Sequence, residues 1–186
     1  MTGAYPRDLA FIAAVFGVAA LVWATWGQEH PPRGWWWRAI LGLESLAGLA
    51  LGVGGGVLLG RLWTAPTAIE PGTTAFVVSV VVFWVELAFA IVLGLLAIRA
   101  GWSDYVSPAL LLLVGLDLAV LTPALQQPFL FIAAVLLVGV TAFALFAPTD
   151  DVARGFWCGI LGAPVFVATG TWAALAVVPA AVGATP

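Results

Sequence analysis

Six long apolar segments, almost free of charged residues, constrain the fold of this chain more than any other feature. They cover residues 9–26, 35–63, 74–98, 105–122, 129–147 and 155–178, and Pro stands at most of their boundaries. A helix that crosses the hydrocarbon core of a bilayer needs about 17–25 apolar residues. The segments are continuously apolar and do not alternate, which disfavours a membrane β-barrel. We therefore predict an all-α protein, a polytopic bundle of six transmembrane helices with short loops, in a single integral membrane domain over residues 1–186.

The composition excludes several classes of protein. Hydrophobic residues make up 63% of the chain and charged residues only 8%, whereas a soluble domain carries about 25% charged residues. The basic residues are six scattered Arg with no Lys, so we expect no nucleic-acid partner. Cys158 and His30 are the only residues of their kinds. They cannot supply a zinc site, an iron–sulfur site or a bis-His haem, and we expect neither a metal nor a cofactor.

The six Arg divide unequally between the two ends of the predicted bundle. Four lie on the first, third and fifth connections and two on the opposite side: Arg33, Arg38, Arg99 and Arg154 against Arg7 and Arg61. Arg-rich loops stay preferentially in the cytoplasm, so we predict a plasma-membrane protein with both termini outside. Most of the Trp residues lie at the same predicted cytoplasmic boundary. They form a belt that anchors in the headgroup region or, alternatively, line a groove for a pigment or lipid.

Glycine recurs at every fourth position of the second segment, at Gly48, Gly52, Gly56 and Gly60. Residues four apart lie nearly above one another on a helix, so we predict a strip against which another helix backbone packs closely. The run Gly54-Gly55-Gly56 alternatively indicates a hinge-like segment. In the last segment, Pro164 frees the carbonyl of Ile160 from its helical hydrogen bond, and we expect a kink there.

Three acidic residues lie inside the apolar segments, namely Glu44, Glu86 and Asp117. Their depths from the predicted cytoplasmic ends are about 14, 20 and 18 Å at the rise of an α-helix, near the middle of the hydrocarbon. An ionised carboxylate there costs at least about 2.5 kcal/mol, so these side chains should face the bundle interior. Small residues extend the helix faces of Glu44 and Glu86, which we expect to enter helix contacts and which could meet. Asp117 has bulky neighbours on its helix face, so the sequence does not indicate whether its side chain points into a helix contact.

No Arg or Lys lies at that depth to neutralise the three acids. The carboxyl groups can be protonated, share a proton or balance a bound cation. Three roles are therefore open. The acids can hydrogen-bond across helices and hold the bundle in register, they can form a proton relay or cation path, or they can act as a catalytic carboxylate pair within the membrane.

A short pattern over residues 81–140 contains Val85-Glu86-Leu87, Arg99 and Leu113-Val114-Gly115-Leu116. In these residues the chain resembles an uncharacterised group of small, six-helix prokaryotic integral membrane proteins. In that group an aromatic-flanked His often follows the Gly, whereas Asp117-Leu118-Ala119 stands here. The resemblance implies a membrane location without an activity, and no site residue is transferred from it.

From these features we predict a small permease or channel-like protein coupled to protons or cations. Its relay candidates are Glu44, Glu86 and Asp117, its solvent is the lipid bilayer, and its ligand is a small solute or cation. The alternative is a non-catalytic accessory or assembly subunit of a larger membrane complex, with other protein subunits or further copies of itself as partners. A third hypothesis is a lipid-acting membrane enzyme, which the lack of a G-x-S-x-G elbow or an intramembrane Ser-His pair makes less expected.

Overall fold

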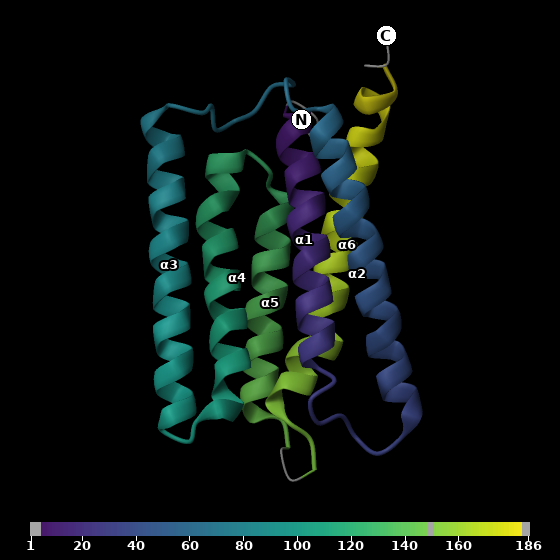
Figure 1. The fold of residues 1–186 in the computed structure, drawn as a ribbon, viewed down its shortest axis with the longest axis vertical. Coiled ribbons are helices and arrows are strands. Elements are labelled where there is room, and N and C mark those ends of the chain that lie inside the picture. The colour runs from purple at the N-terminus through teal and green to yellow at the C-terminus, as the bar shows by residue number, and fades with distance from the viewer. Residues whose placement is uncertain (1–4, 149–150, 184–186) are drawn as a thin grey trace.

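The computed structural model describes residues 5–148 and 151–183, apart from the side chains of residues 75, 78, 79, 82 and 179–183. Within these residues every regular element is helical (Figure 1). The elements are α1 (Pro6–Trp26), α2 (Trp35–Arg61), α3 (Thr74–Arg99), the 3-10 helix η1 (Ser103–Tyr105), α4 (Val106–Leu125), α5 (Phe129–Phe146) and α6 (Arg154–Gly183). The prediction of an all-α protein is confirmed for the described residues.

Five of the helices are long and apolar enough to cross a membrane. They are α1, α2, α4 together with η1, α5 and α6. Helix α3 has 26 residues, but its side chains are described only in part and it is not among these five. A membrane-embedded helical protein is therefore supported, and the sixth crossing remains a prediction.

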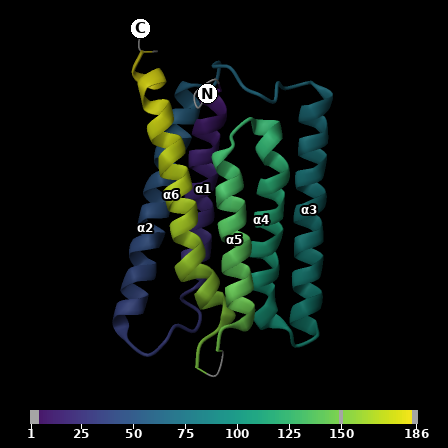
Figure 2. The same cartoon turned by 180° about the vertical axis from the view of Figure 1, so that it is seen from behind.

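The helices follow one another around the bundle in an order that differs from their order in the chain. Helix α1 packs against α2 and α6, α5 packs against α6 and α4, and α3 packs against α4 and η1. Figures 1 and 2 show α2 and α3 at opposite sides of the assembly. Helix α1 begins where α6 ends, so the first, third and fifth connections share the other end. We call that end the Arg-rich end, after the four Arg residues that it carries: Arg33, Arg38, Arg99 and Arg154.

A strip of small residues on α1 lets this helix pack closely against its neighbours. Ala10, Ala13, Ala20 and Ala24 are fully buried, and they recur three and four residues apart together with Gly17. Residues at these spacings lie on one helix face. Small side chains there let adjacent helix backbones approach closely, which favours association in lipid through van der Waals contact.

Two prolines predicted to end helices lie inside them. Helix α4 continues past Pro123 to Leu125 and ends at Gln126, whose φ of 54° is left-handed. Helix α6 likewise continues past Pro179. A proline removes only its own N–H donor and the hydrogen bond to the carbonyl four residues earlier. Near the end of a long helix this loss is small, so the last turn survives.

Buried Asp8 binds the loop between α2 and α3 to the start of α1. Its carboxylate accepts a hydrogen bond of 2.6 Å from the hydroxyl of Thr67 and another of 2.6 Å from the backbone N–H of Ala68. Beside it, the guanidinium carbon of Arg7 lies 4.2 Å from the ring centroid of Trp63. These contacts hold the first part of the loop over α1, and the loop then crosses the bundle to α3 (Figure 1).

Candidate functional site

Two of the three acids inside the apolar segments come together between α3 and α4. The carboxyl groups of Glu86 and Asp117 lie in electrostatic contact and within hydrogen-bonding reach of each other. Both side chains are half-buried. A carboxylate only accepts hydrogen bonds, so a hydrogen bond between two carboxyl groups requires one of them to be protonated. The pair, which we call the carboxyl pair, can therefore hold one proton between two acids.

The small residues of α3 explain how Glu86 reaches this position. Ala90, Gly94 and Ala97 follow Glu86 at intervals of three and four residues, and all three line the contact with α4. A Cβ added at Gly94 would lie 3.7 Å from the Cγ1 of Val106 on α4, an ordinary van der Waals distance. This face of α3 is thus the face turned to α4, and Glu86 continues it by one helical turn.

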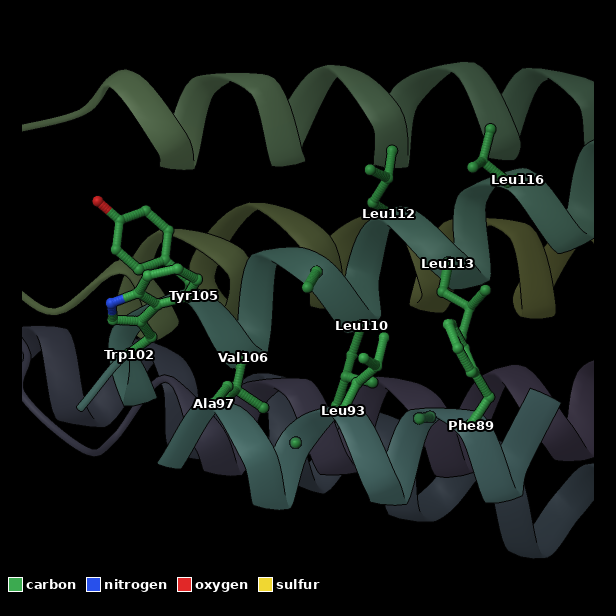
Figure 3. Close-up of a pocket in the computed structure, with 13 residues that line it drawn as sticks. Phe89, Leu93, Ala97, Trp102, Tyr105, Val106, Leu110, Leu112, Leu113 and Leu116 are labelled. Atoms are coloured by element: carbon green, nitrogen blue, oxygen red, sulfur yellow. The ribbon is translucent and has the colours of Figure 1, made fainter. Parts of the chain in front are cut away.

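A groove of about 330 Å³ runs along the same interface. Figure 3 shows Trp102 and Tyr105 together at one end of the groove and Phe89, Leu113 and Leu116 towards the other. Every residue that lines the groove is apolar or aromatic. The aromatic end belongs to η1 and the residue before it, so the groove begins at the Arg-rich end and extends towards the middle of the bundle.

Glu44 lies apart from the carboxyl pair, which corrects the expectation that Glu44 and Glu86 could meet. Glu44 is on α2, and α2 and α3 lie at opposite sides of the bundle (Figures 1 and 2). The loop between α2 and α3 crosses the bundle before α3 begins (Figure 1), and α3 then packs against α4 and η1. The Oε2 atom of Glu44 is buried and has no hydrogen-bond partner among the described residues. Glu44 therefore stays a candidate without a defined partner.

The glycines of α2 divide between two faces of the helix. Gly48 and Gly52 lie against α1, and a Cβ at Gly48 would approach the carbonyl oxygen of Gly17 to 2.8 Å. Gly55 shares this contact, because its Cβ would lie 2.7 Å from the carbonyl carbon of Ala13. Gly56 and Gly60, predicted for the same strip, have open space beside them in the described structure. The close approach to α1 thus uses Gly48, Gly52 and Gly55.

Helix α6 is one continuous element through Pro164, where the sequence predicts a kink. Five residues later, the hydroxyl of Thr169 donates a hydrogen bond of 2.7 Å to the carbonyl of Val165. A Thr hydroxyl bonded to the carbonyl four residues earlier is satisfied without leaving the helix. The segment after Pro164 thus keeps the hydroxyl of Thr169 within α6, and the kink at Pro164 stays a prediction.

Aromatic side chains gather at the Arg-rich end. The rings of Trp23 and Trp26 stack with centroids 5.4 Å apart, and the guanidinium carbon of Arg154 lies 4.3 Å from the ring centroid of Tyr105. Further edge-to-face contacts join Phe143 of α5 to Trp157 of α6. These contacts link several helices where the predicted membrane boundary lies. The belt and the pigment or lipid groove both remain predictions for these Trp.

Two polar features were not among the predicted site residues. Asp8 stands just before the first predicted apolar segment, yet it is only 6% exposed. Its only signal in the sequence is a carboxylate in the first turn of a helix. Cys158 is buried and lies within hydrogen-bonding reach of Ser107 on α4. In the described ranges, no group of three or more His, Cys, Asp or Glu gathers that could hold a metal ion.

Comparison of the chain with protein-family models, with curated proteins and with solved structures finds no match. The function must therefore be inferred from the positions and chemistry of the side chains. The carboxyl pair is the one place where two of the predicted relay candidates meet.

Proposed function

We propose that this chain is a small permease or channel-like membrane protein that couples to protons or cations through Glu86 and Asp117. The observation that carries the proposal is the contact between their two carboxyl groups. Ionisable residues inside membrane-spanning segments are costly, and they usually mark ion or proton pathways. We take α3 as the sixth membrane-spanning helix, so that the pair lies within the hydrocarbon.

The chemistry of the pair supports exchange of a positive charge. Two carboxylates in contact repel each other, and burial makes the ionised forms more costly still. A proton shared between them, or a small cation bound in its place, removes most of this cost. The basic residues of the chain lie at the helix ends and in loops, so none is at hand to neutralise the pair permanently.

Orientation is part of the proposal. We place the Arg-rich end in the cytoplasm of a cell with a plasma membrane and both termini outside, following the preference of Arg for cytoplasmic loops. In this orientation the groove between α3 and α4 begins on the cytoplasmic side.

Proton flux into liposomes tests the proposal. Purified protein would be reconstituted with an internal pH-sensitive dye, and an inward pH gradient with a permeant counter-ion would be imposed. We expect Glu86→Gln and Asp117→Asn each to lower the flux at least about tenfold, because an amide keeps the size of the acid but cannot carry the proton. Glu70→Gln, which changes an exposed loop acid, is the matched control and should leave the flux unchanged.

Two results would contradict the proposal. One is a flux through the unmodified protein that equals the flux into liposomes without protein. The other is a Glu86→Gln variant as fast as the unmodified protein when both are correctly inserted. Glu44→Gln adds a third comparison, and we expect it to retain most of the flux, since Glu44 lies away from the pair.

A second candidate function is a non-catalytic assembly subunit. It is favoured by the open space beside Gly56 and Gly60 on the outer side of α2, because small residues four apart are typical of helix–helix contacts in membranes. The mass of the protein in a mild detergent tests it. The account predicts a complex larger than the 19.3 kDa chain that dissociates in Gly60→Leu. A monomer before and after the change counts against it.

A further inference from the structure

The carboxyl pair lies on the same helix faces as the groove between α3 and α4. On α3 the lining residues Ala97, Leu93 and Ala90 lie on the same face as Glu86, eleven, seven and four residues away. On α4 the lining residues Leu110 and Leu113 precede Asp117 by seven and four residues, again on one face. The two acids lie within hydrogen-bonding reach of each other at the next turn. They are not among the residues that line the groove, but they lie on the same two helix faces, one turn beyond its inner end.

An apolar groove with acidic groups one turn beyond its inner end is complementary to one chemical class of ligand. The apolar walls favour a hydrocarbon or aromatic body, and the carboxyl pair favours a positive charge. None of the residues lining the groove is basic. Phe89, one turn from Glu86, adds an aromatic ring near the place of the charge, and aromatic rings attract organic ammonium ions.

We propose that this groove binds a small lipophilic ammonium ion, with its apolar body between α3 and α4 and its charged nitrogen at Glu86 and Asp117. The inference rests on the proposed function and names the ligand class of the same site. The volume of about 330 Å³ lies at the lower end of known small-molecule pockets, about 300–1,000 Å³. It therefore suits an amine with one ring or a short branched chain.

Binding of the ammonium ion exchanges it for a proton. When the pair holds one shared proton and takes up one monovalent cation, that proton leaves the carboxyl group, so the net charge of the site is conserved. The other titratable or charged groups on the packed elements lie towards the Arg-rich end. They are Arg99 on α3, Asp104 and Tyr105 on η1, and Arg154 and Cys158 on α6, while α5 carries none. The exchange is thus assigned to the carboxyl pair.

An anionic phospholipid is the competing occupant of this groove. Its acyl chain would fit the apolar walls and its phosphate would need a cation at the mouth. Two candidates lie at this end of the bundle, namely exposed Arg99 at the end of α3 and Arg154, whose guanidinium already lies over the ring of Tyr105. A phospholipid would also leave the carboxyl pair without a partner of opposite charge. The apolar body of an ammonium ion fits the apolar walls, and its positive charge fits the carboxyl pair. The ammonium ion is therefore favoured.

Equilibrium binding of radiolabelled phenethyltrimethylammonium to the purified protein in detergent tests the inference. We expect saturable binding that weakens at least about tenfold in Glu86→Gln, as for the loss of one partner of a buried charge pair. The neutral carbon isostere 3,3-dimethylbutylbenzene should not displace the probe. Ala109→Phe, at an exposed lining position, should fill the groove and abolish binding. Its matched control is Ala142→Phe at an exposed position of α5, which should leave binding unchanged.

The outcomes separate this inference from the proposed function. If proton flux depends on Glu86 but the probe does not bind, the proposed function stands and the ligand class is wrong. If the probe is displaced equally by its neutral isostere, or by phosphatidylglycerol with no effect of Glu86→Gln, the groove is a lipid site and the inference is overturned. If the probe binds as expected but no proton flux is measured, the ligand class stands and the permease is wrong.

Discussion

Asp8 shows how a single charged residue positions a distant part of this protein. Both of its carboxylate oxygens are used, one by the hydroxyl of Thr67 and one by the N–H of Ala68. Removing the carboxylate would leave the N–H of Ala68 without its acceptor and the hydroxyl of Thr67 with only a longer hydrogen bond of 3.3 Å to the carbonyl of Ile69. This loop leads to α3, the helix that carries Glu86.

We predict that Asp8→Ala lowers the free energy of unfolding by about 1–3 kcal/mol, the cost of leaving partly buried donors unpaired. Thermal unfolding in detergent would measure the loss as a shift of the midpoint. The control is Asp151→Ala, because Asp151 is exposed. Equal midpoints for the two variants would show that the Asp8 hydrogen bonds contribute no stability.

The carboxyl pair could be predicted from the sequence only in part. Small residues such as Ala90 and Gly94 on the face of Glu86 indicate that this acid enters a helix contact. The partner could not be predicted, because it depends on which helix lies next to α3. That choice is made by the path of a loop, through contacts such as those of Asp8, and a loop path leaves no periodic pattern. The bulky neighbours of Asp117 likewise do not indicate which helix this acid faces.

At the scale of the helix, the contact between α1 and α2 follows from helical geometry. Each residue turns the helix by about 100°, so a step of four residues drifts by about 40°. Gly60 is therefore rotated by about 120° from Gly48, whereas Gly55, seven residues on, is only about 20° away. This explains why Gly55 joins the contact with α1 and Gly60 does not. A spacing of four residues therefore keeps two glycines on one helix face over one step, but it does not keep them there over three steps.

We predict opposite effects of the same substitution at two of these glycines. Gly48→Ala should destabilise the protein by about 1–3 kcal/mol, because the added methyl enters a filled contact. Gly56→Ala, with open space beside it, should be neutral or stabilise the helix by up to about 1 kcal/mol. Unfolding of both variants in the same detergent makes the comparison. A Gly48→Ala variant as stable as Gly56→Ala would contradict the packing of α1 on α2.

At the scale of the whole molecule, the number and approximate bounds of the helices could be predicted from the apolar segments, but their neighbours could not. In lipid, apolar faces carry little information about which helix they meet, because the tails around them are as apolar as the partner helix. The side of the bundle that α3 occupies is thus a result of tertiary structure.

Cross-linking tests this placement of α3. In a Cys158→Ser background, Gly94→Cys paired with Val106→Cys should form a cross-link with a short reagent that is thiol-reactive at both ends, since a Cβ at Gly94 would lie 3.7 Å from the Val106 side chain. Gly94→Cys paired with Gly56→Cys should not, because α2 and α3 lie at opposite sides of the bundle. Cross-links within one chain for the second pair would overturn the helix order.

The most direct test of the central claim, that Glu86 and Asp117 act as one proton or cation site, is a double-mutant cycle on the flux into liposomes. The rates of Glu86→Gln, Asp117→Asn and the double variant would be compared with that of the unmodified protein. Residues that act as a unit are strongly non-additive, so the account predicts that the double variant is no slower than the slower single variant. Losses that multiply in the double variant would show two independent sites and contradict the account.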